Sequence, residues 1–590
     1  MGTTAPGRFY RTKAIALGDN RVTFKLVPVL ALLVTGPALA DPLARIEGVS
    51  DASLRAALET AIGEREAQAG GVSSALRDAR TAADRARRLL RSRGYYAATL
   101  EPMIGPQQEA VVQIAPGPVF IIADIATETG DDEDARATAR DAIGLETGTP
   151  LRAQSVIDAE AQGLVALHNS GWPDARIEDR RVVVDHATEE GRITFRYTPG
   201  PWSTYGEIER DTGPWNPQFI ARMSPFTTGE PANREEILEY QKRLTELDSV
   251  GAADITLGPV GEDGNRPVSV ELTPSARHSI ETGLSYSTSE GGGGNVRWIR
   301  RNLRGNDETL TLSAGIATLN QSLLASVSRP HWRRFDQTLR LHAGLVSEDT
   351  DAYQQEEAEI GVEVTRRDGR RTYGIGPHID WSRVTDAFGE RDVITAAVDL
   401  VAGYDSRTDP LDPDSGIYGM VQVTPATTLG DCGCQYVRLE GRASTYYRLS
   451  DTTVAALRMR VGSVLGASAT AMPADQRFYA GGGGSARGFD YQSLSPLAPD
   501  GTPFGGISVV ETSAELRWRV RERWGVVGFV DSAMASSDRQ PDLSNLRTAV
   551  GVGVRYYFDF APVRVDIATP LDRRDGEDPV QIYFSLGQAF

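Results

Sequence analysis

The chain has 590 residues, and 80 acidic against 62 basic side chains give it a formal net charge of −18. This length is too great for one hydrophobic core, so we expect several domains. The acidic balance argues against nucleic acid as the main partner, because a duplex-binding domain carries a basic face.

Residues 21–40 have the composition of a secretory signal peptide. Two basic residues precede a short apolar run that ends in Ala-Leu-Ala. This arrangement is typical of a leader removed on export, and it predicts cleavage before Asp41. A membrane anchor is the alternative, but a Gly-Pro pair at 36–37 interrupts the run. We assign residues 1–40 to the signal peptide, and no later stretch reaches the ~18 consecutive apolar residues of a transmembrane helix.

Residues 42–275 contain an internal repeat. Helix-like runs at 78–92 and 153–170 are each followed by glycine and an aromatic residue, and the two marks lie about 77 residues apart. A less faithful third copy of the mark lies at 249–253. The pattern predicts three α+β units, each in the order strand, helix, helix, strand, strand. Their expected boundaries are 41–117, 118–201 and 202–275.

Catalytic and metal chemistry find little support in the sequence. The six histidines are scattered, without an H-E-x-x-H pair or a nucleophile elbow. The acidic run at 131–134 is compatible with calcium, but it precedes a helical pattern and suits the positive end of a helix better. We therefore expect no enzyme activity, no metal and no cofactor.

Only two cysteines occur, Cys432 and Cys434. They are too few for a four-ligand zinc site, and they lack the C-x-x-C redox spacing. We favour a local disulfide between them in an oxidising compartment, with free thiols as the alternative because so small a ring is strained.

From about residue 277 onward the chain alternates polar and apolar residues in segments of about ten. In residues 510–520 the even positions are Val, Thr, Ala, Leu, Trp and Val, whereas the odd positions are Glu, Ser, Glu, Arg and Arg. No helical pattern is present to cover the apolar face, so lipid must cover it, and lipid tolerates only a closed sheet. We expect a transmembrane β-barrel in a Gram-negative outer membrane. Sixteen strands fit, with starts near 279, 294, 307, 320, 336, 353, 371, 394, 415, 435, 454, 506, 524, 546, 561 and 580.

A glycine-rich stretch at 481–490 interrupts these strands. Its letters fit a dinucleotide motif, but no helical pattern follows, so that interpretation fails. A flexible surface loop is a second alternative. We favour a loop inserted into the barrel with a docking tip formed by Arg487, Gly488 and Phe489.

A buried Arg487 requires an acidic partner. Glu515 lies on the polar parity of its strand and is the first candidate, although a charge facing water is the alternative. Asp531 is the second. Because Val527 and Phe529 share its parity, we expect a bulge or local twist there.

Barrel closure is expected to be weakest where the first strand meets the last. The first strand carries Ile280, Thr282 and Leu284, and the last carries Gly587 and Phe590. A short, glycine-containing end makes few ladder bonds, so this seam should open readily.

These features together resemble the POTRA-plus-barrel superfamily of outer-membrane insertases and secretion transporters. The family's loop motif matches residues 481–489, with alanine at 486 where the family usually has valine. Further matches are the acidic positions Glu515 and Asp531, the turn at 404–407, the closing segment 562–571 and the terminal Phe590.

The resemblance covers about residues 42–590 and implies the domain plan. The three repeats correspond to polypeptide-transport-associated (POTRA) domains in the periplasm, and residues 276–590 to a sixteen-stranded barrel. It also implies insertion through the seam without nucleotide or catalytic residues, with clients received by β-augmentation.

The repeat count discriminates within the family. BamA usually carries five POTRA domains, and two-partner secretion transporters carry two, preceded by a plug helix. Three repeats resemble the TamA group, which implies a TamB-like inner-membrane partner. We therefore expect an insertion and assembly factor for outer-membrane proteins, including autotransporters, with unfolded clients and outer-membrane lipid as partners. The alternative is a secretion pore for one specific exoprotein.

Overall fold

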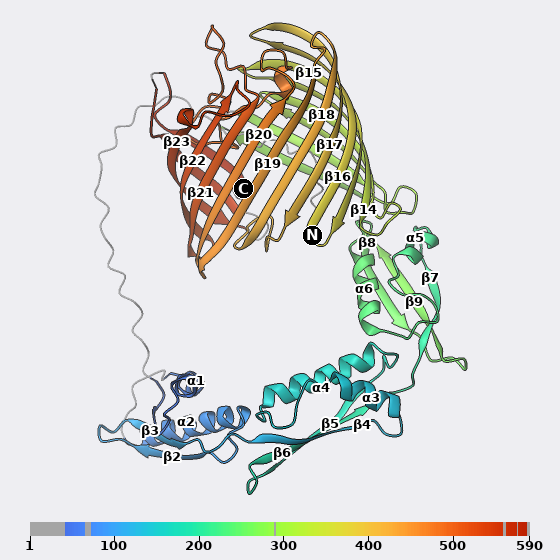
Figure 1. Ribbon diagram of the computed structural model, residues 1–590, viewed down its shortest axis with the longest axis vertical. Coiled ribbons are helices and arrows are strands. Elements are labelled where there is room, and N and C mark those ends of the chain that lie inside the picture. Colours follow the sequence, from blue (N-terminus) through green and yellow to red (C-terminus); the bar gives the residue numbers. More distant parts are fainter. Residues whose placement is uncertain (1–41, 65–71, 288–290, 559–561, 575, 587–590) are drawn as a thin grey trace.

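The computed structural model describes residues 42–64, 72–287, 291–558, 562–574 and 576–586. An arm of α+β units leads into a large barrel (Figure 1). The expected signal peptide and the expected seam residues Gly587 and Phe590 lie outside the described residues. Among the helices described, none combines the length and apolarity that crossing a membrane requires.

The arm consists of three units, each with two helices and a three-stranded sheet. In every unit the first strand runs parallel to the last, which occupies the centre of the sheet. This is the element order that the repeat predicts. The first unit contains β1 (Arg45–Glu47), α1 (Ala52–Ile62), α2 (Val72–Ser92), β2 (Thr99–Ile104) and β3 (Ala110–Ala115). The second contains β4 (Ile121–Glu128), α3 (Glu133–Ala142), α4 (Ala153–His168), β5 (Arg176–Asp185) and β6 (Glu190–Thr198). The third contains β7 (Thr204–Asp211), α5 (Pro217–Arg222), α6 (Arg234–Thr245), β8 (Val250–Leu257) and β9 (Asn265–Pro274).

The acidic run at 131–134 starts a helix. The Asp132 side chain accepts a hydrogen bond from the Ala135 amide at 2.9 Å and so caps α3. Glu133 and Asp134 occupy its first turn, where negative charge meets the positive helix end. In the described part of the chain, no group of three or more His, Cys, Asp or Glu side chains is arranged to hold a metal ion.

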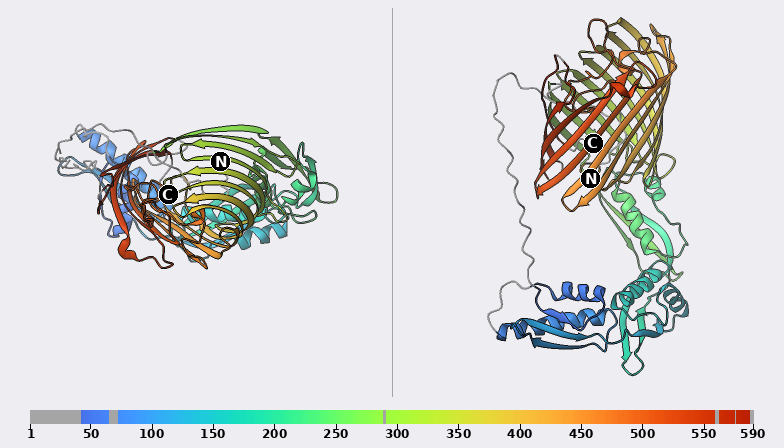
Figure 2. Two further views of the ribbon diagram at one scale, coloured as in Figure 1. Left: turned by 90° about the horizontal axis from the view of Figure 1, so that it is seen from above. Right: turned by 60° about the vertical axis from the view of Figure 1, so that its left-hand side comes forward.

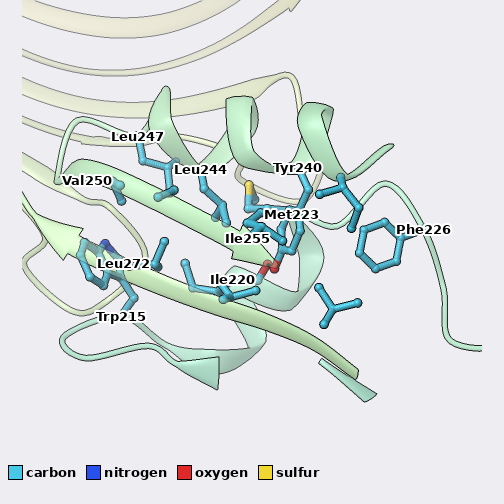
Figure 3. Close-up of a cluster of buried hydrophobic side chains, with 14 of the residues drawn as sticks. Trp215, Ile220, Met223, Phe226, Tyr240, Leu244, Leu247, Val250, Ile255 and Leu272 are labelled. Atoms are coloured by element: carbon cyan, nitrogen blue, oxygen red, sulfur yellow. Dashed lines mark hydrogen bonds between the residues drawn. The ribbon is translucent and has the colours of Figure 1, made fainter. Parts of the chain in front are cut away.

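The third unit has an aromatic-rich core between its two helices and its sheet. Figure 3 shows Trp215, Ile220, Met223, Tyr240 and other side chains packed between α5, α6 and the strands β8 and β9. The Trp215 indole donates to the Ser249 hydroxyl at 2.7 Å, so its one polar group is satisfied. This packing gives the unit next to the barrel a hydrophobic core of its own.

The barrel is one antiparallel sheet of sixteen strands, which confirms the predicted fold class. Each expected start lies within five residues of the observed one. The strands are β10 (His278–Ser287), β11 (Gly291–Arg300), β12 (Thr309–Ala317), β13 (Asn320–Arg329), β14 (Gln337–Asp349), β15 (Tyr353–Asp368), β16 (Arg371–Asp386), β17 (Gly389–Asp405), β18 (Gly416–Gly430), β19 (Gln435–Ser450), β20 (Thr453–Leu465), β21 (Ser508–Arg521), β22 (Trp524–Ser536), β23 (Arg547–Tyr557), β24 (Pro562–Pro570) and β25 (Gln581–Leu586). Neighbours in the sequence are neighbours in the sheet, and β10 and β25 also lie next to each other. Figure 2 shows the resulting ring from above.

The two faces of the barrel differ in polarity as the alternation predicts. On β21, Leu516 and Trp518 are each 52% exposed, whereas Glu515 and Arg517 are each 4% exposed. The outer face is therefore apolar and the inner face charged, because only lipid covers the outside.

A turn of the barrel, residues 301–308, docks on the third unit. The Asp307 carboxylate accepts hydrogen bonds from the backbone amides of Asp248 and Ser249, at 3.1 and 2.9 Å. The Asn216 amide donates to the Gly305 carbonyl at 2.7 Å, and Gly305 has a φ of +90°. A side chain at this position would meet the Asn216 nitrogen at 2.9 Å, so the close approach requires glycine.

A second turn, residues 330–336, contacts the same unit. The Arg243 guanidinium of α6 lies 4.3 Å from the centre of the Phe335 ring. Burial and the nearby charges of Arg243 and Arg222 lower the pKa of His331 to about 4. Two turns therefore join the arm to the barrel.

Asp307 makes this joint sensitive to pH. Burial raises its pKa to about 6, so the folded joint binds the proton more tightly than the unfolded chain does. Its contribution to stability is complete below its ordinary pKa and is lost as the pH rises through 6. We expect the joint to be about 1 kcal/mol more stable at pH 5 than at pH 7 through this group. Hydrogen exchange of the amides of residues 248 and 249 measures it.

His331 acts in the opposite sense, because its lowered pKa removes stability as the pH falls from 6.5 towards 4. The effect of Asp307 is therefore measured as the difference in the pH dependence of this hydrogen exchange between the wild type and Asp307→Asn. An identical pH dependence in both proteins would contradict the assignment.

Candidate functional site

Residues 466–507, between β20 and β21, fold into the barrel, and residues 481–490 form what we call the inserted loop. Gly481, Gly482 and Gly488 have φ values of +105°, +93° and +99°, which only glycine adopts readily. The Gly482 amide donates to the Phe489 carbonyl, closing the loop on itself. Arg487 is 2% exposed and Phe489 3% exposed, so this is not a flexible surface loop.

Arg487 lies at the centre of a buried ion-pair cluster. Its Nη1 lies 2.8 Å from Glu515 and 3.1 Å from Asp566, and its Nε lies 2.7 Å from Asp531. The Arg487 backbone amide also donates to Asp531 at 3.0 Å. The guanidinium stacks on the Phe529 ring, 3.5 Å from its centre. Three strands, β21, β22 and β24, thus hold one arginine.

The tip is also bonded to the last strand. The Gly488 amide donates to the Tyr583 hydroxyl at 2.8 Å, and that hydroxyl donates to the Phe489 carbonyl at 3.2 Å. The side-chain amide of Gln581 donates to the Asp490 carboxylate at 2.6 Å. Tyr583 and Gln581 belong to β25, so the inserted loop contacts the strand that borders the seam.

Comparison with known proteins relates the barrel to a family. The model of the Omp85 superfamily domain matches residues 302–590. These 289 of the 590 residues are similar to an Omp85 superfamily domain. The barrel lies in the outer membrane, and the three α+β units before it lie in the periplasm.

Individual relatives are distant. The outer membrane protein assembly factor BamA of Nitratidesulfovibrio vulgaris is 23% identical over 390 residues, which are 63% of this chain and 49% of that protein. The chain thus spans about half the length of this curated relative. The structure of Haemophilus ducreyi BamA lacking POTRA domains 1–3 has a TM-score of 0.66 at 16% identity, covering 80% of this chain and 99% of that one, and it supports the fold. CdiB from Acinetobacter baumannii has a TM-score of 0.47 at 14% identity, covering 92% and 99%.

The described ladder between β21 and β22 has no bulge near Asp531. The only register shift between β21 and β22 in the described ladder lies at Arg519 and Arg521, at the periplasmic ends of these strands. Val527 and Phe529 do face inward, 1% and 4% exposed. The expectation of a bulge was wrong, because both side chains have partners inside the barrel: the Arg487 guanidinium stacks on Phe529, and Val527 clusters with Phe529, Ala568 and Tyr583.

Two residues of the site were missed in the sequence. Asp566 follows Arg564 in the closing segment, and its inward parity could have been read from the alternation of β24. Asp566 also pairs with Arg555 of β23. Tyr583 breaks the polar parity of the last strand, and its hydroxyl holds the tip.

The expected seam and cysteine residues occupy other parts of the barrel. Ile280 is 71% exposed and Thr282 is exposed on the outer face of β10, while the Leu284 backbone pairs with Gly294 of β11. A disulfide joins Cys432 and Cys434 in the extracellular turn between β18 and β19.

Gly488 allows the loop tip to approach the barrel wall. A Cβ at this position would lie 2.7 Å from the Ala549 Cβ, and the φ of +99° disfavours any other residue. We expect Gly488→Ala to destabilise the docked tip by about 1–3 kcal/mol. Protease cleavage of residues 466–507 in the folded barrel measures the effect. Gly501→Ala is the matched control, because Gly501 has a positive φ in the same segment but open space around it. Equal cleavage of both variants would contradict the close-packed tip.

Proposed function

We propose that the chain is an outer-membrane protein insertion and assembly factor that opens at the seam between β10 and β25. One observation carries the proposal: the tip held by the ion-pair cluster is bonded to β25 through Tyr583 and Gln581. The loop therefore links the inner wall to the strand that must move when the seam opens.

Opening the seam would expose unpaired backbone groups of two strands. An incoming β-segment of an unfolded outer-membrane protein can pair with such an edge. Its backbone groups would then be satisfied as they enter lipid, which tolerates no open edge. On this mechanism the protein acts without enzymatic chemistry.

The three α+β units support a periplasmic role in receiving clients. We propose unfolded outer-membrane proteins, including autotransporters, as clients, and a TamB-like inner-membrane protein as partner. The unit count of the described arm and the resemblance to TamA support this assignment. Co-purification from solubilised membranes tests the partner. Recovery of a secreted exoprotein in place of a TamB-like protein would favour a secretion pore.

Reconstitution tests the insertion activity. The purified chain in liposomes should accelerate the folding of a urea-denatured outer-membrane barrel protein, scored by its heat-modifiable mobility on gels. Liposomes that contain the Arg487→Ala variant are the matched control. Equal folding with the wild type, the variant and empty liposomes would overturn the proposal.

A further inference from the structure

We propose that the hairpin joining β15 and β16 binds the headgroup of an anionic phospholipid in the periplasmic leaflet. The hairpin, residues 365–373, carries four arginines within six residues: Arg366, Arg367, Arg370 and Arg371. It lies at the periplasmic end of the barrel, because β15 runs towards that end and β16 runs away from it.

The strand register sets two arginine–tyrosine pairs on the outer face. Arg366 lies opposite Tyr373, and Arg371 lies opposite Tyr404 of β17. Tyr373 and Tyr404 are 47% and 42% exposed. Arg370, in the turn, hydrogen-bonds the Tyr404 side chain. Directly opposed residues share a face of the sheet, so guanidinium and phenol groups gather where the barrel leaves the membrane.

The apolar band begins next to these pairs. Val364 and Ile375 are opposed on the same outer face, and Leu400 of β17 lies opposite Ile375. Ile375 and Leu400 are exposed. A ligand bound by the arginines therefore lies next to exposed apolar side chains on its membrane side. A phospholipid fits this arrangement, since its phosphate meets the arginines and its acyl chains lie along the band.

Acidic residues only partly balance the hairpin. Asp336 lies 2.5 Å from Arg366, and Asp368 lies 4.0 Å from it. Asp405 is bound through both carboxylate oxygens by Arg407. Arg366, Arg370 and Arg371 thus meet two carboxylates, both of which lie beside Arg366, and this leaves positive charge for an anion. Guanidinium groups bind phosphate oxygens in a bidentate manner.

The other end of the same strands provides a contrast. On β16, Arg383 pairs with Asp392 at 3.0 Å and lies 3.8 Å from Glu390. Acid and base are matched there. The excess of positive charge on these strands belongs to the periplasmic hairpin, where the leaflet consists of phospholipid.

Native mass spectrometry of the full chain in nonionic detergent tests the proposal. The probes are dioleoyl-phosphatidylglycerol, which is anionic, and dioleoyl-phosphatidylcholine, which is zwitterionic. We expect the wild type to retain the anionic lipid preferentially. Arg370→Gln/Arg371→Gln should reduce that retention about tenfold, since each basic residue near an anionic surface contributes to binding. Arg370→Lys/Arg371→Lys should keep most of it, and Arg383→Gln should keep all of it.

Heat-modifiable gel mobility shows that each variant is folded, and the single Arg371→Gln variant stands in if the double variant is not. Equal retention of both lipids by the wild type would overturn the proposal. So would an equal loss in Arg383→Gln, which would indicate a general charge effect. Inorganic phosphate that displaces the lipid at millimolar concentration would also overturn it, because the site would then be selective for the free anion.

Discussion

Arg487→Ala is expected to release the inserted loop while the barrel still folds. The substitution leaves Glu515, Asp531 and Asp566 buried around an empty space. Removing one partner from a buried charge cluster typically costs about 3–5 kcal/mol, and here the Asp531 carboxylate loses its ion pair while Glu515 and Asp566 keep Arg517 and Arg555. The barrel itself should persist, because its strands are held by backbone ladders. We expect rapid protease cleavage within residues 466–507. We also expect client insertion to slow at least tenfold, because the docked loop loses roughly a few kcal/mol of stability.

Arg383→Ala is the matched control for this prediction. Arg383 also forms ion pairs on a barrel strand, but it is half-exposed on the outer face and away from the inserted loop. An exposed pair typically contributes at most about 1 kcal/mol, so little change is expected. Wild-type protease resistance and wild-type insertion in Arg487→Ala would exclude a role for the cluster.

A disulfide across the seam is expected to stop insertion. Position 282 of β10 can be changed to cysteine and combined in turn with cysteine at 582, 584 or 586 of β25, the strand beside it. A pair whose Cβ atoms come within about 4.5 Å will cross-link on oxidation. The linked protein cannot separate its first and last strands, so client folding should fall to the rate of empty liposomes.

Reduction supplies the control in the same sample. The native Cys432 and Cys434 should first be replaced by serine, so that only the new bond responds to the reductant. Insertion should return when the bond is reduced. Full activity in the oxidised, fully cross-linked protein would contradict opening at the seam.

Much of this fold could be predicted because the barrel repeats one simple rule. Alternate residues face lipid and interior, so polarity alone identifies strands such as residues 510–520 and the turns between them. The arm was predictable for a related reason, since three copies of one unit repeat the same marks. Asp132, for example, caps α3 as its place before a helical pattern suggests.

The interior contacts were harder to predict because they depend on register and on the path of one long loop. Tyr583 breaks the polarity pattern, and its role appears only when the loop tip lies against β25. Phe529 is an apolar side chain on the inner face, and its partner, the Arg487 guanidinium, comes from the inserted loop. The Asp307 joint likewise depends on contacts between residues nearly 60 positions apart, which no local pattern reveals.

Site-specific photo-cross-linking during client insertion tests the central claim most directly. A photoreactive residue at position 282 should cross-link to the entering client, whereas one at position 421, which is equally on the outer face but on β18, should not. Cross-links at 421 as frequent as those at 282, or none at 282 while insertion proceeds, would contradict entry through the seam.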